Sequence, residues 1–155
     1  MKRTLICTLA AASLVAPNIT FAKTSTENSK KIAVVKKVFQ NFNNHRSTNI
    51  LKNATPTFQR AVRNDNVRTP DGEMNCQPWD MMGGSDPMIK NPKFTTNKKG
   101  NVLVSYRNHS SLEKLEFQLT KTGSRYAIAD IWNTDEIYEG KSFISLMNEC
   151  QLYGL

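Results

Sequence analysis

Asp130 is the carboxylate with the best case for chemistry in this sequence of 155 residues. Strict alternation along its segment would place it on one face with Tyr126, Ile128 and Trp132. A carboxylate buried among such neighbours can act as a general base, with Tyr126 or Tyr106 donating a hydrogen bond to an anionic intermediate. The alternative is a structural aspartate, at a strand end or past a bulge, that accepts hydrogen bonds from backbone N–H groups. Because the sequence names no partner for a base, we favour the structural alternative.

Histidines and short catalytic motifs give little support for an enzyme. His45 and His109 are the only histidines, and they leave too few ligands at suitable spacing for a zinc site. Exposed loop histidines are the simpler interpretation. The sequence contains no nucleophile elbow, glycine-rich phosphate loop or HExxH motif. We therefore expect no metal and no cofactor, and binding is favoured over catalysis.

The N-terminus has the three parts of a secretory signal. A basic start is followed by an apolar stretch from Thr4 to Ala16 and by Ala22 at the expected cleavage point. The apolar stretch is shorter than the roughly 20 residues that cross a bilayer, and no later segment reaches that length. We therefore expect a signal peptide over 1–22, a single domain over 23–155, no transmembrane segment, and a periplasmic or secreted location.

Two of the three cysteines remain after cleavage, Cys76 and Cys150. An even number in an oxidising compartment predicts one disulfide bond, and two separately buried thiols are the alternative. A bridge that closes so long a loop would stabilise the fold by about 4 kcal/mol in the chain-entropy model.

The positive charge has limited meaning for function. A formal net charge of +8 favours anionic partners by long-range attraction. The basic residues are scattered over the expected helices and turns without interleaved aromatic residues, so we expect no nucleic-acid partner.

A binding surface is suggested by the segment 66–92, which is rich in proline and in large apolar residues such as Met88. The segment either forms an adaptable binding surface or folds over the sheet and closes the core beside Cys76. The residues expected at a binding site are Trp79, Met82, Tyr106, Asp130 and Trp132.

Two helices are predicted in the first half of the mature chain. Apolar residues recur at helical spacing from Ile32 to Phe42, and the following asparagines end the pattern. Thr55 is a typical N-cap, with Pro56 at the first helical position of a second helix that fades by Asp65.

The second half changes to a period of two. Val102, Val104 and Tyr106 alternate with polar or smaller residues, as do Leu115 and Phe117 in the next segment. A closing helix begins at Ser142. Helices grouped first and strands grouped after predict an α+β fold in which N-terminal helices pack on an antiparallel sheet of about four strands.

A family resemblance supports this fold. The matching positions are Phe39, Phe42, Asp86-Pro87 and Tyr126-x-Ile128-x-Asp130-Ile131. With these residues the chain resembles a family of small exported bacterial proteins of unknown function that have the nuclear-transport-factor-two-like, or cystatin-like, fold. The resemblance implies a curved antiparallel sheet wrapped on helices, a cone whose open end can form a pocket. It implies no particular chemistry.

The expected function is therefore a non-enzymatic binding module of the cell envelope that recognises a protein or a small ligand. Two alternatives stay open. One is an immunity protein that inhibits a cell-wall-degrading secreted toxin, and the other is a small enzyme that uses the cone pocket with Asp130.

Overall fold

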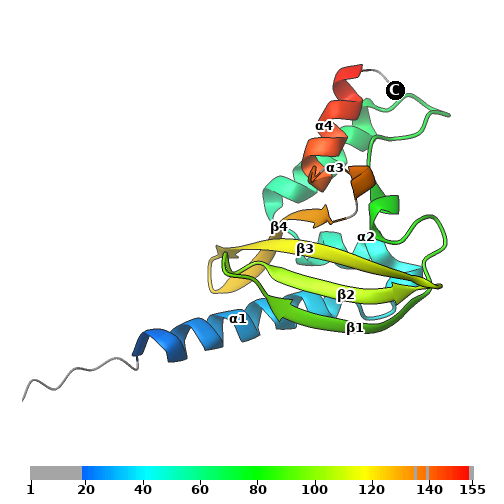
Figure 1. Cartoon of the computed structure of the whole chain (residues 1–155). Helices are drawn as coiled ribbons and strands as arrows, with labels where there is room; N and C mark the ends of the chain where they lie inside the picture. Colours follow the sequence, from blue (N-terminus) through cyan, green and yellow to red (C-terminus); the bar gives the residue numbers. More distant parts are fainter. Residues whose placement is uncertain (1–18, 135, 139, 154–155) are drawn as a thin grey trace, which may run out of the picture.

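The computed structural model describes residues 19–134, 136–138 and 140–153, so most of the predicted signal peptide lies outside the described residues. The described chain is α+β, with four α-helices and one antiparallel sheet (Figure 1). This confirms the predicted class and the closing helix. The elements are α1 Ile19–Val38, α2 Phe42–Asn53, α3 Pro56–Arg68, the 3₁₀ helix η1 Trp79–Met82, β1 Ile89–Thr96, β2 Val102–Asn108, β3 Ser111–Thr122, β4 Arg125–Asn133, the 3₁₀ helix η2 Glu136–Tyr138 and α4 Phe143–Tyr153.

The N-terminal helical region differs from the prediction of one helix that runs to Phe42. Helix α1 ends at Val38, and Asn41 has a left-handed backbone with φ of 52°, a conformation that asparagine tolerates better than most residues. A new helix, α2, then begins. The Asn49 side chain donates hydrogen bonds to the carbonyls of Val38 (3.2 Å) and Gln40 (2.6 Å), which satisfies the end of α1. Helix α2 was not predicted because its sequence is mostly polar.

The predicted helix starts of α3 and α4 are both present. Thr55 Oγ1 accepts a hydrogen bond from the backbone N–H of Phe58 at 3.2 Å, with Pro56 in the first turn. Ser142 Oγ accepts one from the backbone N–H of Ser145, also at 3.2 Å. Each cap satisfies a helical N–H that has no partner within the helix.

The sheet is a simple antiparallel meander in the order β1-β2-β3-β4, with a bulge in β4. Pairing with β3 shifts between Ile128 and Asp130, so Ala129 is an extra residue in its strand. Because one extra residue reverses the alternation of side chains, Ile131 is buried while Asp130 and Trp132 lie on the opposite face. The expectation that Asp130 and Trp132 share the face of Ile128 is therefore wrong.

Helices α1 and α2 cover one face of the sheet, and aromatic rings fill the space between them. Phe39 stacks on Phe42 with ring centroids 4.6 Å apart. The same ring contacts Phe94, Tyr106 and Phe117 of the sheet at 5.5, 5.8 and 6.1 Å. This packing leaves the opposite face of β1, β2 and β3 uncovered, where alternate side chains are exposed or half-buried.

A second cluster joins α3, α4 and η1 beside β4, as Figure 1 shows for the two helices. The Phe143 ring lies 5.1 Å from Phe58 and 4.6 Å from Trp79. The backbone N–H of Thr55 donates to the carbonyl of Ile128 at 2.8 Å, which ties the start of α3 to β4. Trp79, Met81 and Met82 of the 66–92 segment thus contribute to closing the core, while Met74 and Met88 are exposed.

Candidate functional site

The uncovered face of the sheet contains an open hollow of about 530 Å³. We call it the sheet-face hollow. Its lining residues are Lys99, Asn101, Glu116, Gln118, Trp132, Asn133, Thr134 and Gly140. Glu116 and Trp132 are direct partners across β3 and β4, so their side chains leave the sheet on the same face and next to each other.

Glu116 is held in one orientation by the turn between β1 and β2. Its Oε1 accepts hydrogen bonds from Asn97 Nδ2 at 3.0 Å and Asn101 Nδ2 at 2.6 Å. Asn97 is itself fixed, because its Oδ1 accepts the backbone N–H groups of Lys99 and Asn101, each at 3.0 Å. No hydrogen bond reaches Oε2 of Glu116 within the described part of the chain. The result is an oriented carboxylate with one oxygen free to accept a hydrogen bond.

Trp132 provides an aromatic surface beside this carboxylate. The side chain is half-buried, and its backbone is fixed by a bridge to Ser142 at the start of α4. Its indole N–H donates no hydrogen bond to any group in the described part of the chain. A half-buried tryptophan offers an apolar ring face and one unused donor, a combination that is typical of binding sites.

Asp130 lies on the same face as Trp132 but is engaged with the backbone. Its Oδ1 accepts hydrogen bonds from the N–H of Ile131 at 2.9 Å and from the N–H of Ile144 at 3.2 Å. Ile144 belongs to the first turn of α4, where a negative charge is favourable. These are the contacts of a structural aspartate that follows a bulge.

Tyr106 and Met82 lie in the core rather than at a surface. Met82 is fully buried in η1, and Tyr106 is 1% exposed on the face covered by α1 and α2. Burial raises the pKa of the Tyr106 hydroxyl, and the nearby Glu113 raises it further. The hydroxyl has no hydrogen-bond partner among the described residues. Since Asp130 faces the other side of the sheet, the structure does not bring the proposed base and this proton donor together.

Trp79 is the expected binding residue of the 66–92 segment. It packs on Phe143, and its indole N–H donates to Gln77 Oε1 at 2.8 Å. Its one hydrogen-bond donor is therefore used within the protein, and the side chain is half-buried.

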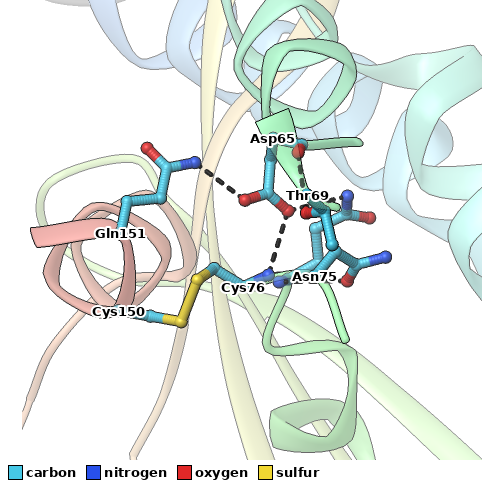
Figure 2. The surroundings of a disulfide bond; sticks show 7 residues. Asp65, Thr69, Asn75, Cys76, Cys150 and Gln151 are labelled. Carbon is cyan, nitrogen blue, oxygen red and sulfur yellow. Dashed lines mark hydrogen bonds between the residues drawn. A yellow bond between two sulfur atoms is a disulfide. The ribbon is translucent and has the colours of Figure 1, made fainter. Parts of the chain in front are cut away.

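The predicted disulfide bond between Cys76 and Cys150 is present, with Cα atoms 5.6 Å apart (Figure 2). Asp65, which is 2% exposed, lies beside it and organises the surrounding chain. Its Oδ2 accepts the backbone N–H of Cys76 at 3.1 Å and Gln77 Nε2 at 3.0 Å. Its Oδ1 accepts Gln151 Nε2 at 2.8 Å, which connects α3 to α4.

Residues 69–78, which we call the braced loop, project from this anchor. The Thr69 hydroxyl donates to the carbonyl of Asp65 at 2.9 Å, and Cys76 holds the other end. Between them the tip carries exposed Asp71 and Glu73 and a Met74 side chain that is 91% exposed. The loop is therefore fixed at its base and presents one apolar side chain that follows two acidic residues in the sequence.

Neither Glu116 nor Asp65 was identified from the sequence. Val62 follows Phe58 by four residues and Asp65 follows Val62 by three, which places Asp65 on the buried side of α3. That spacing was the available signal for Asp65. Glu116 depends on asparagines from another turn, and nothing in its local sequence indicates them.

Metal binding and membrane insertion receive no support from the described part of the chain. It contains no group of three or more His, Cys, Asp or Glu side chains that could hold a metal ion. His109 is exposed at the β2–β3 turn, with a ring nitrogen 3.1 Å from the carbonyl of Asp86. No described helix is both long and apolar enough to span a bilayer.

No family model, curated protein or solved structure matches this chain. What the structure defines is an α+β protein with a helix-covered antiparallel sheet, a hollow on the free face of that sheet, and a disulfide-anchored loop.

Proposed function

We propose that this chain is an exported, non-enzymatic binding module that holds a small polar ligand in the sheet-face hollow. The observation that carries the proposal is the Glu116 carboxylate, which two asparagine amides orient beside the half-buried Trp132. Groups that are already ordered lose little conformational freedom on binding, so each contact to a ligand contributes more to affinity.

The packing of the interior favours binding at the surface over catalysis in a cone pocket. We propose that the fold belongs to the cystatin-like class, for which the opening helix and the antiparallel meander are the support. In this chain the rings of Phe39, Tyr106 and Phe117 fill the space between helix and sheet. Asp130 is used as an acceptor for backbone N–H groups.

Export to the periplasm is part of the same proposal. The supports are the signal-like N-terminus and the disulfide bond between Cys76 and Cys150, because such bonds persist in oxidising compartments. The partner is accordingly sought in the cell envelope.

The test is an NMR titration of isotopically labelled mature protein with the small-molecule fraction of a periplasmic extract. We expect the indole N–H of Trp132 and the side-chain amides of Asn97 and Asn101 to shift and saturate, while the indole N–H of Trp79 serves as the internal control. A spectrum in which these amides do not move would reject the hollow as a ligand site.

A second candidate function rests on the braced loop. A disulfide bond and the buried Asp65 fix its base, and its Met74 tip is 91% exposed. Such a pre-ordered convex loop suits insertion into the cleft of a partner protein. The partner in this case is a cell-wall-degrading secreted toxin, with the chain acting as its immunity protein.

This second function predicts a gene for a cell-wall-degrading secreted enzyme beside this one, and that enzyme provides the test. We expect the purified chain to inhibit that enzyme, Met74→Asp to abolish inhibition, and Trp132→Ala to leave it unchanged. Full inhibition by Met74→Asp, or no inhibition by the native chain, would exclude the braced loop as an inhibitory element.

A further inference from the structure

We infer that the ligand of the sheet-face hollow is a saccharide, with one sugar ring stacked on Trp132 and a hydroxyl group donating to Glu116 Oε2. The inference rests on the proposed function, because it names the ligand class of the same site. It follows from the charge, the hydrogen-bonding groups and the shape of the hollow.

The charges of the hollow favour a neutral ligand. Among the residues that the structure describes, its charged lining residues are Glu116 and Lys99, one of each sign. An anion would be repelled by the oriented carboxylate of Glu116. A cation would approach a mature chain whose formal charge is +6, because cleavage removes Lys2 and Arg3 from the total of +8, and it would meet long-range repulsion.

The unused hydrogen-bonding groups require a ligand that both donates and accepts. Glu116 Oε2 can only accept, while the Trp132 indole N–H can only donate. The exposed Gln118 amide does both, and within the described part of the chain it forms no side-chain hydrogen bond. Hydroxyl groups donate and accept, so adjacent hydroxyls of a sugar satisfy all three side chains. An apolar ligand would leave them desolvated without partners.

The aromatic ring explains why a sugar is favoured over other polar neutral molecules. A pyranose has a face of C–H groups and an edge of hydroxyl groups. The ring face of Trp132 covers the C–H face of the sugar, and its cross-strand partner Glu116 accepts a hydrogen bond from the hydroxyl edge. Two amides already orient the carboxylate, so the position of the accepting oxygen is set before the ligand arrives.

The size and openness of the hollow fit a saccharide that continues beyond the site. A volume of about 530 Å³ lies within the usual range for small-ligand sites. The hollow opens on the free face of the sheet, so a chain of further sugar units can leave it toward solvent. Glycan polymers of this kind are abundant in the cell envelope.

The experiment is an NMR titration of the disulfide-bonded mature protein with chitotriose, cellotriose and maltotriose. Choline chloride and inorganic phosphate are the cationic and anionic comparison probes. We expect at least one saccharide to shift the Trp132 indole and the Asn97 and Asn101 amides saturably, and neither comparison probe to do so. Trp132→Ala and Glu116→Gln should each weaken saccharide binding by about tenfold or more.

Two controls keep the result interpretable. Gln118→Ala, at an exposed position, should weaken binding without any effect on folding, and Trp79→Phe, away from the hollow, should leave affinity unchanged. Saccharide shifts that survive Trp132→Ala would overturn the inference, as would saturable binding of choline or phosphate in the hollow. A hollow that responds to the periplasmic fraction but to no saccharide would overturn the saccharide inference while the proposed function stands.

Discussion

The sheet-face hollow and the braced loop are each organised by one carboxylate, and the two carboxylates differ in what they leave unused. Asp65 is 2% exposed and accepts hydrogen bonds on both oxygens. Glu116 is partly exposed and accepts on Oε1 alone. The same chemical group therefore serves structure when all its acceptor sites are occupied, and remains available to a ligand when one oxygen is held and the other is free.

The largest expected effect concerns the covalent part of the braced loop. The double variant Cys76→Ala with Cys150→Ala should lower the free energy of unfolding by about 4 kcal/mol, because the bridge restricts the unfolded chain over a separation of 74 residues. Urea unfolding at pH 7 measures this loss. Free-thiol titration of the denatured, unreduced native protein should detect no thiol, and two reactive thiols would contradict the bridge.

The next effect separates the two carboxylates directly. Asp65→Ala should cost about 3 kcal/mol of stability, because a buried network loses its only common acceptor. Glu116→Ala should cost less than about 1 kcal/mol, since its asparagine partners can reach water. Both values come from urea melts under one set of conditions. Equal losses at the two positions would remove the distinction between them.

Substitution of Asp130, which lies on the same face as the hollow, should cause an intermediate loss of stability. Asp130→Asn should cost about 1–3 kcal/mol, because the amide disturbs the acceptor for the N–H groups of Ile131 and Ile144 and adds a donor. The change in urea midpoint at pH 7 is the measurement. An unchanged or raised midpoint would revive the view that Asp130 is kept for catalysis.

The smallest expected effect is a gain in stability at Tyr106, whose buried hydroxyl has no partner in the described chain. Tyr106→Phe should stabilise the protein by up to about 1 kcal/mol at pH 7. Burial raises the pKa of native Tyr106, while unfolded tyrosine ionises near pH 10. The unfolded state therefore loses this proton first as pH rises, so native stability should fall above about pH 10, and less steeply in Tyr106→Phe. Melts from pH 8 to pH 11 test both signs.

Features encoded by neighbouring residues were predictable from the sequence. The caps at Thr55 and Ser142 are local, because the capping side chain and its N–H partner lie three residues apart. Strands β2 and β3 were predicted from the alternation of apolar residues with polar or smaller ones. The pairing of Cys76 with Cys150 followed from their number and the expected compartment.

Features that depend on distant contacts were not predictable. Helix α2 is polar, and its position depends on Asn49 reaching the end of α1. The network at Asp65 requires α4 to lie against α3, through Gln151. The oriented carboxylate of Glu116 requires a turn that lies next to β3 only after the sheet has formed.

The bulge at Ala129 means that the face on which Trp132 lies depends on one residue that has no partner in β3. Deleting Ala129 would leave the rest of β4 in strict alternation, with Ile128 and Ile131 toward the helices and Asp130 and Trp132 on the free face, where they already lie. Keeping Ala129 but pairing it with β3 would shift every later residue of β4 by one position, turning Trp132 toward the helices and the buried Ile131 toward solvent. The binding surface therefore tolerates the loss of one small residue, but it does not tolerate the loss of the bulge while that residue remains.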